Sequence, residues 1–366
     1  MNQDKGLDKQ KLKKKRIILS IVSAIIIIVF VAVIITILQI KSNVDRMIIP
    51  NTIVNTEPSP ITDEVIVVPE EEKELKDFYL FVMGLDYRGS HNALLTDSLI
   101  VFHIIPEQKA VKLLSIPRDL LVENDYGHQV KINSIFSEGY YATLNKAKKD
   151  PSILTNDEIQ LGNKVVDKAV LSGAMASTRT EINEILDINI DHTVIVNFNT
   201  ITSLVDEVGG IEIDVKRKMQ YRATNLYLEP GLQTLNGEQA LGYARFRHDN
   251  RGTRYYATDF ERGMHQQEVV KALASKILSW NNVTKVFSLL DIVSKNVQTD
   301  MDYSTMYSMV KDYYSLFNGD SFHSIPFPEF YSNSGDVIIP DNELDSLREL
   351  FKATEIENSP MIDQTQ

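Results

Sequence analysis

The chain has 366 residues, a formal net charge of −12 and no cysteine. The lack of cysteine excludes disulfides, thiolate catalysis and cysteine-ligated metals. The acidic balance argues against a nucleic-acid-binding protein, which needs a basic face.

The N-terminal segment has the pattern of a membrane anchor. Residues 1–16 hold seven basic side chains against two acidic ones, and residues 17–40 contain no charged residue. A helix of that length spans the roughly 30 Å of a bilayer core. A cleaved signal peptide would have a shorter apolar stretch, of about 7–15 residues, and a small-residue cleavage site. We therefore expect a cytoplasmic basic tail over 1–16 and an uncleaved transmembrane helix over 17–40, with the C-terminal bulk outside the cell membrane.

After the anchor, the composition predicts a linker and then a folded domain. Residues 41–77 carry four prolines and an acidic run, which disfavour packing. Apolar runs predict strands over 78–83, 98–105, 110–116, 193–198 and 211–215. Helical spacing predicts helices over 165–187, 200–208, 237–245, 259–279, 283–295, 303–316 and 341–352.

This alternation indicates an α/β fold. We predict a single large α-β-α layered domain with a mixed central sheet over 78–330, preceded by one transmembrane helix. Residues 331–366 are expected to form a C-terminal helix and a frayed polar tail. Residues 141–164 are expected to form variable loops.

Two aspartates lie where predicted strands begin or end, the place where α/β folds bind ligands. Asp86 follows the first strand and Asp97 opens the second. Two such carboxylates suit Mg²⁺, which takes one or two carboxylates together with phosphate oxygens. The alternative is that each is a turn or capping residue, which is the commoner role of aspartate at a strand end.

Arginines are concentrated at two further places. Arg118 and Asp119 follow the strand over 110–116, and the planar guanidinium suits phosphate, although an ion pair at a turn is the alternative. The second place is denser and comprises Arg245, Arg247, Asp259, Arg262 and Gln266. A di- or polyphosphate ligand explains these arginines in an acidic domain. A solvated charged face does not explain the aromatic residues between them.

Eight motifs, in order along the chain, resemble the LytR–CpsA–Psr family. They are GLDYR (84–88), TDSLIVFHI (96–104), SIPRDL (115–120), KIN (131–133), DHTVIVNF (191–198), VDEVGGIEIDV (205–215), LEPGLQTLNGEQALGYARFR (228–247) and DFERGMHQQEVV (259–270). The match covers most of residues 78–275, and the position of the expected anchor agrees with it.

The resemblance implies a cell-wall glycopolymer transferase. Such an enzyme moves a sugar phosphate, for example of teichoic acid or capsule, from a polyprenyl-pyrophosphate carrier to a peptidoglycan hydroxyl. By resemblance, Asp86 and Asp97 would hold Mg²⁺, and Asp119 and Asp259 would orient arginines or accept the hydroxyl proton. The polyprenyl tail would occupy an apolar channel between sheet and helices. The side chains that would bind the substrate are Arg118, Arg245, Arg247, Arg262, His265 and Gln266.

Two positions depart from the family pattern. Leu95 stands where the family usually has an arginine shortly before the second aspartate, and His265 replaces an arginine immediately before Gln266. Neither restores a permanent charge, because histidine is only partly protonated at neutral pH. The departures imply a weaker grip on pyrophosphate, a different polymer or reduced activity. They keep open a non-catalytic module that binds polyprenyl lipid or glycan, and a hydrolase that cleaves the lipid pyrophosphate with water. A DNA-binding regulator is disfavoured, because about 16 cytoplasmic residues cannot fold alone.

Overall fold

The computed structural model describes residues 47–49, 76–86, 94–161, 164–279, 297–302 and 319–355, and positions 289, 292–294, 305–306 and 309. The chain divides into two units, Met1–Arg46 and Met47–Gln366, and every described residue belongs to the second. The expected cytoplasmic tail and transmembrane helix lie outside the described residues, as do most of the expected helices over 283–295 and 303–316. Among the residues that are described, no helix combines the length and apolarity needed to cross a bilayer.

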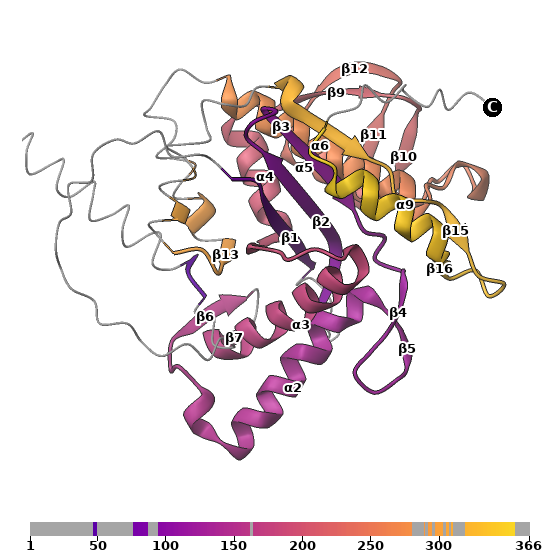
Figure 1. The fold of residues 1–366 in the computed structure, drawn as a ribbon. Helices are drawn as coiled ribbons and strands as arrows, with labels where there is room; N and C mark the ends of the chain where they lie inside the picture. Colours follow the sequence, from indigo (N-terminus) through magenta and orange to yellow (C-terminus); the bar gives the residue numbers. More distant parts are fainter. Residues whose placement is uncertain are drawn as a thin grey trace, which may run out of the picture. The chain divides into compact units, whose positions relative to one another are not determined.

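A six-stranded mixed sheet forms the centre of the second unit (Figure 1). Its strands, in spatial order, are β13 (Val297–Thr299), β8 (His192–Asn197), β1 (Phe78–Asp86), β2 (Leu95–Ile105), β3 (Ala110–Ser115) and β14 (Phe322–Ile325). The pairs β1–β2, β2–β3 and β13–β8 are antiparallel, whereas β1–β8 and β3–β14 are parallel. The prediction of an α/β domain with a mixed central sheet is confirmed.

Strand β2 shows why the sheet is covered on both faces. Leu99 and Val101 belong to one buried cluster, whereas Ile100 and Phe102 belong to another. Successive side chains of a strand point to opposite faces, so a strand that is apolar at every position needs a packed layer on each side.

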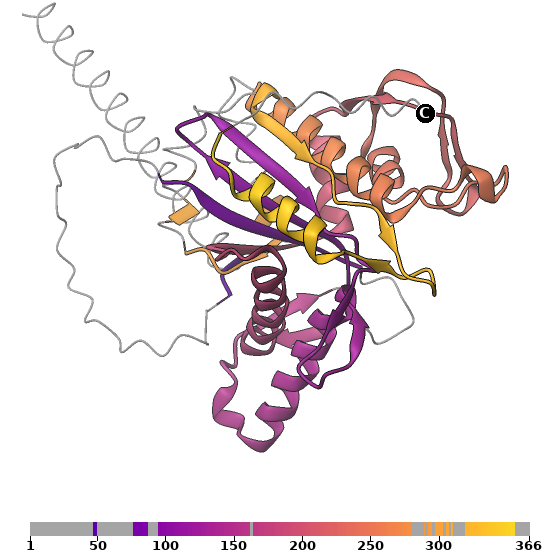
Figure 2. The same ribbon diagram turned by 45° about the vertical axis from the view of Figure 1, so that its right-hand side comes forward.

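The first face of the sheet is covered by α2 (Ile135–Lys149), α3 (Lys168–Leu186) and α9 (Asp341–Lys352). Figures 1 and 2 show α2 and α3 side by side. The two helices approach closely at Gly139 and Gly173, where a Cβ atom would collide with Ser177 and Thr143 respectively. Small residues therefore set the spacing of this layer.

Two expectations about this layer are corrected. Residues 141–149, expected as variable loop, belong to α2, because alanine, leucine and lysine in this segment favour a helix and the helix packs through Gly139 against α3. The helix expected over 165–187 begins only at Lys168. The preceding residues form strand β7 (Lys164–Asp167), and the side chain of Asp167 accepts a hydrogen bond from the backbone N–H of Ala169 as the N-cap.

The second face and the region beyond it contain α4 (Phe198–Glu207), α5 (Gly237–Ala244) and α6 (Asp259–Leu278). Val270 of α6 packs against the cluster of Ile100, Phe102 and Leu113 on the sheet. A separate core joins these helices to four short strands. The strands are β9 (Ile211–Val215), β10 (Met219–Tyr221), β11 (Leu226–Leu228) and β12 (Gly231–Leu235).

The remaining described elements are short. They are β4 (Leu121–Glu123), β5 (Gln129–Lys131), β6 (Glu158–Leu161), β15 (Phe330–Tyr331), β16 (Val337–Ile338), and the 3-10 turns η1 (Ile132–Ser134), η2 (Pro151–Ile153), η3 (Arg222–Thr224), η4 (Thr253–Tyr255) and η6 (Gly319–Ser321). Within the expected linker, Ile49 is buried and its backbone N–H donates to the carbonyl of Thr299 at 2.6 Å.

The C-terminal helix is fastened to the central sheet by a buried lysine. Lys112 on β3 is 3% exposed, and its Nζ donates to the carbonyl oxygens of Leu350 at 2.8 Å and Ala353 at 2.6 Å. These carbonyls lie at the end of α9, where a helix presents acceptors that its own turns do not satisfy. The ammonium group therefore supplies hydrogen-bond donors to the free carbonyls at the end of α9, and these carbonyls compensate for the burial of its charge.

Candidate active site

Asp97 lies at an irregularity in the pairing of β1 with β2. Gly84 pairs with Ser98, and the next residue of β1 pairs with Thr96, so Asp97 has no partner across the ladder. Such a β-bulge bends the strand and redirects a side chain. Close packing adds to the requirement for Gly84, because a Cβ there would lie 2.9 Å from the Cβ of Ser98.

The second expected metal ligand lies at the same edge. Asp86 ends β1 and pairs with Leu95, two residues before Asp97. The side chain of Asp86 is outside the described part of the structure. Where side chains are described, no three His, Asp or Glu residues form a metal-binding group. Mg²⁺ takes one or two protein carboxylates together with water or substrate oxygens, and the carboxylate of Asp97 at the bulge is chemically suited to such an ion.

Arg118 connects this edge to the end of β3. Its Nη1 lies 2.5 Å from Oδ1 of Asp97, and its Nε lies 3.8 Å from Asp119 and 3.9 Å from Asp259. Although burial disfavours the charged form, these three carboxylates raise the pKa of Arg118 above its usual value. Its guanidinium is therefore a permanent cation held among acids from three segments of the chain.

The N-terminus of α6 supplies the next pair. Thr258 and Glu261 form a capping box, in which each side chain accepts a hydrogen bond from the other residue's backbone N–H. The helix start is thereby fixed, and Arg262 lies one turn after Asp259 with its Nη2 2.5 Å from Oδ1 of that residue. Arg262 is only 5% exposed, and burial lowers its pKa to about 10, so it stays charged at neutral pH.

Arg247 closes the group from the segment after α5. Its Nη2 donates to Asp259 at 3.0 Å, and its Nη1 lies 3.6 Å from Oδ2 of Asp119. We call Arg118, Arg247, Arg262, Asp119 and Asp259 the arginine–aspartate cluster. The structure thus brings together residues that are up to 144 positions apart, since 262 − 118 = 144.

The pKa values of the two aspartates of the cluster shift in opposite directions. Burial raises the pKa of Asp259, and the charges of Arg262 and Arg247 oppose this rise without cancelling it. The pKa of Asp119 is lowered although burial opposes it, because Asp259 and Lys131 hydrogen-bond to it and Arg118 contributes its charge. Of the two, Asp119 therefore has the stronger preference for the carboxylate form.

Gln266 and His265 follow Arg262 on α6 and have different surroundings. Gln266 accepts a hydrogen bond from the hydroxyl of Ser98 at 2.9 Å, which ties α6 to the residue after Asp97. The ring of His265 packs against Tyr243, with 4.4 Å between ring centroids. Burial, followed by the charge of Arg217, lowers the pKa of His265 to about 4. The ring is thus neutral at physiological pH.

Arg245 and Leu95 complete the positions singled out by sequence. Arg245 ends α5, where its backbone N–H donates to the carbonyl of Leu241 at 3.1 Å, and its side chain is half-buried. Leu95 is half-buried in β2. It therefore offers an apolar surface at the edge where the family usually has an arginine.

Two neighbours of the cluster were not predicted as site residues. The Nζ of Lys131 lies 3.1 Å from Oδ1 of Asp119, and its place in the KIN motif was the signal that could have identified it. Tyr331 on β15 packs edge-on against Phe260. Its pKa is raised to about 12 by burial and by Glu329 and Asp259, which puts the phenol close to the cluster. No local pattern marks Tyr331, because 69 residues (331 − 262) separate it from Arg262.

Comparison with known proteins gives consistent matches. The model of the LytR_cpsA_psr family matches residues 42–351. The polyisoprenyl-teichoic acid–peptidoglycan teichoic acid transferase TagV of Bacillus subtilis (strain 168) is 30% identical over 236 residues, which cover 62% of this chain and 50% of TagV. The transferase of that description named TagU, from Halalkalibacterium halodurans, is 28% identical over 242 residues, which cover 64% of this chain and 65% of TagU.

A solved structure shares the fold. The crystal structure of B. subtilis TagV has a TM-score of 0.56 and 26% identity, and the match covers 76% of this chain and 97% of that one. In sequence, the matched region spans only half to two thirds of the length of the two curated relatives.

Proposed function

Because the chain belongs to the LytR–CpsA–Psr family, we propose that it is a membrane-anchored phosphotransferase. It moves a glycopolymer, as its sugar phosphate, from a polyprenyl-pyrophosphate carrier to peptidoglycan. The observation that carries this proposal is the convergence of Arg118, Arg247 and Arg262 on Asp119 and Asp259, beside the bulge at Asp97. Such a site favours an anion with two adjacent phosphates, and the two curated relatives described above are named as teichoic acid transferases.

Exposure divides the arginines into two roles. The side chains of Arg118 and Arg247 are 24% and 31% exposed, so their guanidinium groups can exchange carboxylate partners for phosphate oxygens of the donor. The side chain of Arg262 is 7% exposed and stays against Asp259. It acts as a fixed positive charge beneath the pyrophosphate, where the low local dielectric strengthens its effect.

Asp119 is the proposed proton acceptor of the reaction. The hydroxyl oxygen of the acceptor attacks the phosphorus that carries the sugar and forms a new P–O bond. The bond between this phosphorus and the bridging oxygen breaks, and polyprenyl phosphate leaves. The hydroxyl proton passes to Asp119, whose lowered pKa favours the carboxylate form, while Asp259 orients Arg247 and Arg262.

Asp86 and Asp97 would hold Mg²⁺ in this proposal. The ion, when bound, would neutralise charge on the pyrophosphate oxygens. The protein's own part is to keep Asp97 at the bulge next to Arg118, so that carboxylate and guanidinium face the same region.

The lipid half of the donor would lie between the second face of the sheet and α6. There the buried Ile100, Phe102 and Leu113 are joined by partly buried apolar side chains, among them Leu80 and Val82. An apolar layer near an anion site suits a polyprenyl pyrophosphate. We propose that residues 17–40 anchor the chain in the cell membrane, with the N-terminus cytoplasmic and the domain outside, because this arrangement brings the site to a donor that is itself embedded in the bilayer.

Neutral His265 and apolar Leu95 support a second candidate, a non-catalytic module that binds the lipid-linked glycan. The test uses the full-length chain in nanodiscs with Mg²⁺, a polyprenyl-pyrophosphate oligosaccharide and a glycan acceptor. A transferase releases polyprenyl phosphate only when the acceptor is present. Release without acceptor indicates a hydrolase, and binding without release indicates the module. Arg118→Ala should abolish release, whereas Arg222→Ala, at an exposed arginine on η3, serves as the control.

A further inference from the structure

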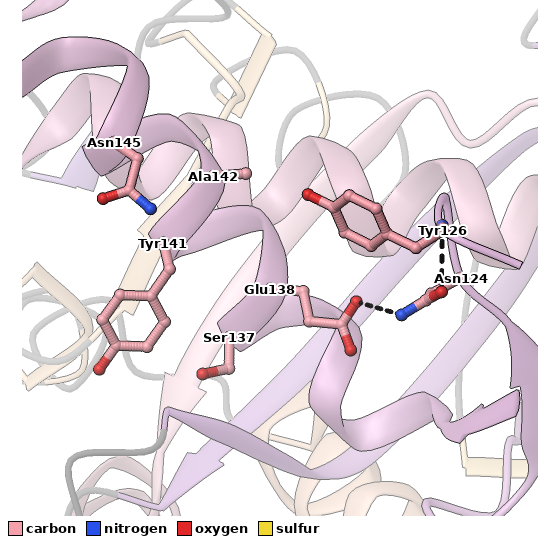
Figure 3. A pocket seen from close by; sticks show the side chains of 7 residues that line it. All are labelled: Asn124, Tyr126, Ser137, Glu138, Tyr141, Ala142 and Asn145. Atoms are coloured by element: carbon pink, nitrogen blue, oxygen red, sulfur yellow. Dashed lines mark hydrogen bonds between the residues drawn. The ribbon is translucent and has the colours of Figure 1, made fainter. Parts of the chain in front are cut away.

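A cavity of about 310 Å³ lies between α2 and the hairpin formed by β4 and β5 (Figure 3). We call it the hairpin groove, and its lining residues are Asn124, Tyr126, Ser137, Glu138, Tyr141, Ala142 and Asn145. These residues are distinct from those of the arginine–aspartate cluster. The groove therefore offers a second recognition surface.

Two exposed tyrosines give the groove its character. Tyr126 at the hairpin tip is 74% exposed, and Tyr141 on α2 is 39% exposed. In Figure 3 they lie on opposite sides of the view, with Ala142 and Glu138 between them. Amide groups of Asn124 and Asn145 line the same cavity. Flat aromatic rings beside fixed hydrogen-bonding groups suit a ligand with apolar faces and polar edges.

The groove is held in shape by its own hydrogen bonds. Both carboxylate oxygens of Glu138 are engaged, by the amide of Asn124 at 3.0 Å and the hydroxyl of Ser134 at 3.3 Å. The side-chain oxygen of Asn124 accepts from the backbone N–H groups of Tyr126 and His128, at 3.1 and 3.0 Å. The hairpin tip, and with it the main chain of Tyr126, is therefore fixed before any ligand arrives.

We propose that the hairpin groove binds a glycan strand and that this strand is the acceptor of the transfer, which rests on the function proposed above. Sugar rings have apolar C–H faces that stack on tyrosine and hydroxyl or acetamido edges that hydrogen-bond to amides. The two tyrosines would contact successive parts of the glycan strand, and the amide of Asn145 would hydrogen-bond to its polar edges.

The position of the hairpin connects the groove to the reacting groups. The hairpin begins two residues after Asp119, and its last residue, Lys131, places Nζ 3.1 Å from that carboxylate. The hydroxyl of Ser134 lies 2.8 Å from the carbonyl oxygen of Lys131 and 3.3 Å from Glu138, so it can donate to either oxygen, and Lys131 is in contact with both the groove side and Asp119. With three residues in each strand, the hairpin spans about 10 Å, at roughly 3.3 Å per residue. A glycan strand bound in the hairpin groove would therefore extend toward the arginine–aspartate cluster.

The two ends of the hairpin groove carry opposite charges, which would orient a bound glycan strand. The last turn of α2, next to Asn145, carries Lys146, Lys148 and Lys149, and the Nζ of Lys148 lies 3.3 Å from the side-chain oxygen of Asn145. The hairpin end instead carries exposed Asp125. Carboxylates on the glycan, such as those of muramic acid, would therefore lie at the Asn145 end.

Titration calorimetry on the full-length chain in nanodiscs tests the site with two probes. One is a tetrasaccharide of alternating N-acetylglucosamine and N-acetylmuramic acid, and the other is neutral chitotetraose. The double variant Tyr126→Ala/Tyr141→Ala should bind both at least about tenfold more weakly. Lys149→Ala should weaken only the tetrasaccharide with carboxylates. Tyr227→Ala, at a tyrosine that is 52% exposed on β11, is the matched control.

The transfer assay separates this proposal from the proposed function. The double variant should raise KM for the acceptor and leave both kcat and donor binding unchanged. Equal binding of the tetrasaccharide by wild type and double variant would overturn the groove assignment even if transfer proceeds. Tyrosine-dependent binding in a chain that transfers to no acceptor would support the groove as a glycan site and refute the transferase.

Discussion

Arg262→Met removes a charge that the fold holds at a cost. Arg262 is 5% exposed, and its pKa is lowered to about 10 chiefly by burial. The difference between the usual pKa of arginine and this value corresponds to a destabilisation of the folded state by about 3 kcal/mol, at about 1.36 kcal/mol per pH unit. Because the folded and the unfolded pKa both lie above neutral pH, the whole penalty is present at pH 7 and disappears only in strongly alkaline solution.

Methionine keeps an unbranched side chain in the same space, and Asp259 keeps its 3.0 Å contact with Arg247. The pKa of Asp259 is already raised, so this carboxyl can take up a proton when Arg262 is gone. We therefore expect the free energy of unfolding to rise by about 1–3 kcal/mol, with a gain of about 2–4 °C in the thermal midpoint for each kcal/mol. Transfer should fall at least about a hundredfold, because a buried charge at the phosphoryl site is lost.

The measurement pairs thermal unfolding, followed by circular dichroism at pH 7, with release of polyprenyl phosphate by the same preparation. Arg222→Met, at an exposed arginine on η3, should change neither quantity. A lower midpoint for Arg262→Met would refute the reasoning, because it would show that the pair with Asp259 stabilises the fold by more than the burial costs.

Three further changes test other parts of the structure. Asp119→Asn should abolish transfer and preserve donor binding. In the wild type, the rate of transfer should fall on the acidic side only below the usual carboxyl range, because the pKa of Asp119 is lowered. His265 has a pKa of about 4 in the fold against 6.5 ordinarily, so wild-type stability should fall as pH drops through this window. His265→Phe, which retains ring packing on Tyr243, should lose less stability over the same pH range in thermal melts. Gly139→Ala should lower the free energy of unfolding by about 1–3 kcal/mol in denaturant titration, because its Cβ would collide with Ser177, and an unchanged midpoint would contradict the packing of α2 on α3.

Local signals were sufficient for most of the sheet and for α6. The strand predicted over 211–215 matches β9, because it follows the Gly209-Gly210 turn and alternates buried and exposed residues. The helix predicted over 259–279 matches α6 to within one residue, because its capping box is a local feature. Helix α2 was not predicted, and the contact of its Gly139 with α3 is a tertiary feature that the sequence alone does not show.

At the site, too, the individual motifs could be predicted from the sequence, whereas the contacts between them could not. The motif around Arg118 and the one around Arg262 each indicated phosphate chemistry, but their meeting at Asp259 depends on the sheet and could not be read from either motif. The opposite pKa shifts of Asp119 and Asp259 were equally inaccessible, because they arise from burial and from neighbouring side chains that the fold brings together. His265 was expected to be partly protonated, whereas burial and the charge of Arg217 lower its pKa to about 4.

The hydrogen bonds from Lys112 to the end of α9 affect the order in which the chain folds during its synthesis. Lys112 leaves the ribosome more than two hundred residues before its acceptors on Leu350 and Ala353, since 350 − 112 = 238. Until they arrive, strand β3 of the growing sheet carries an ammonium group that cannot be buried without large cost. We therefore expect the sheet to close last at β3, and the nascent chain to stay a chaperone substrate until its C-terminal helix has been made. A chain truncated before residue 350 should be degraded rather than accumulate as a folded fragment, and pulse-chase labelling would show this directly.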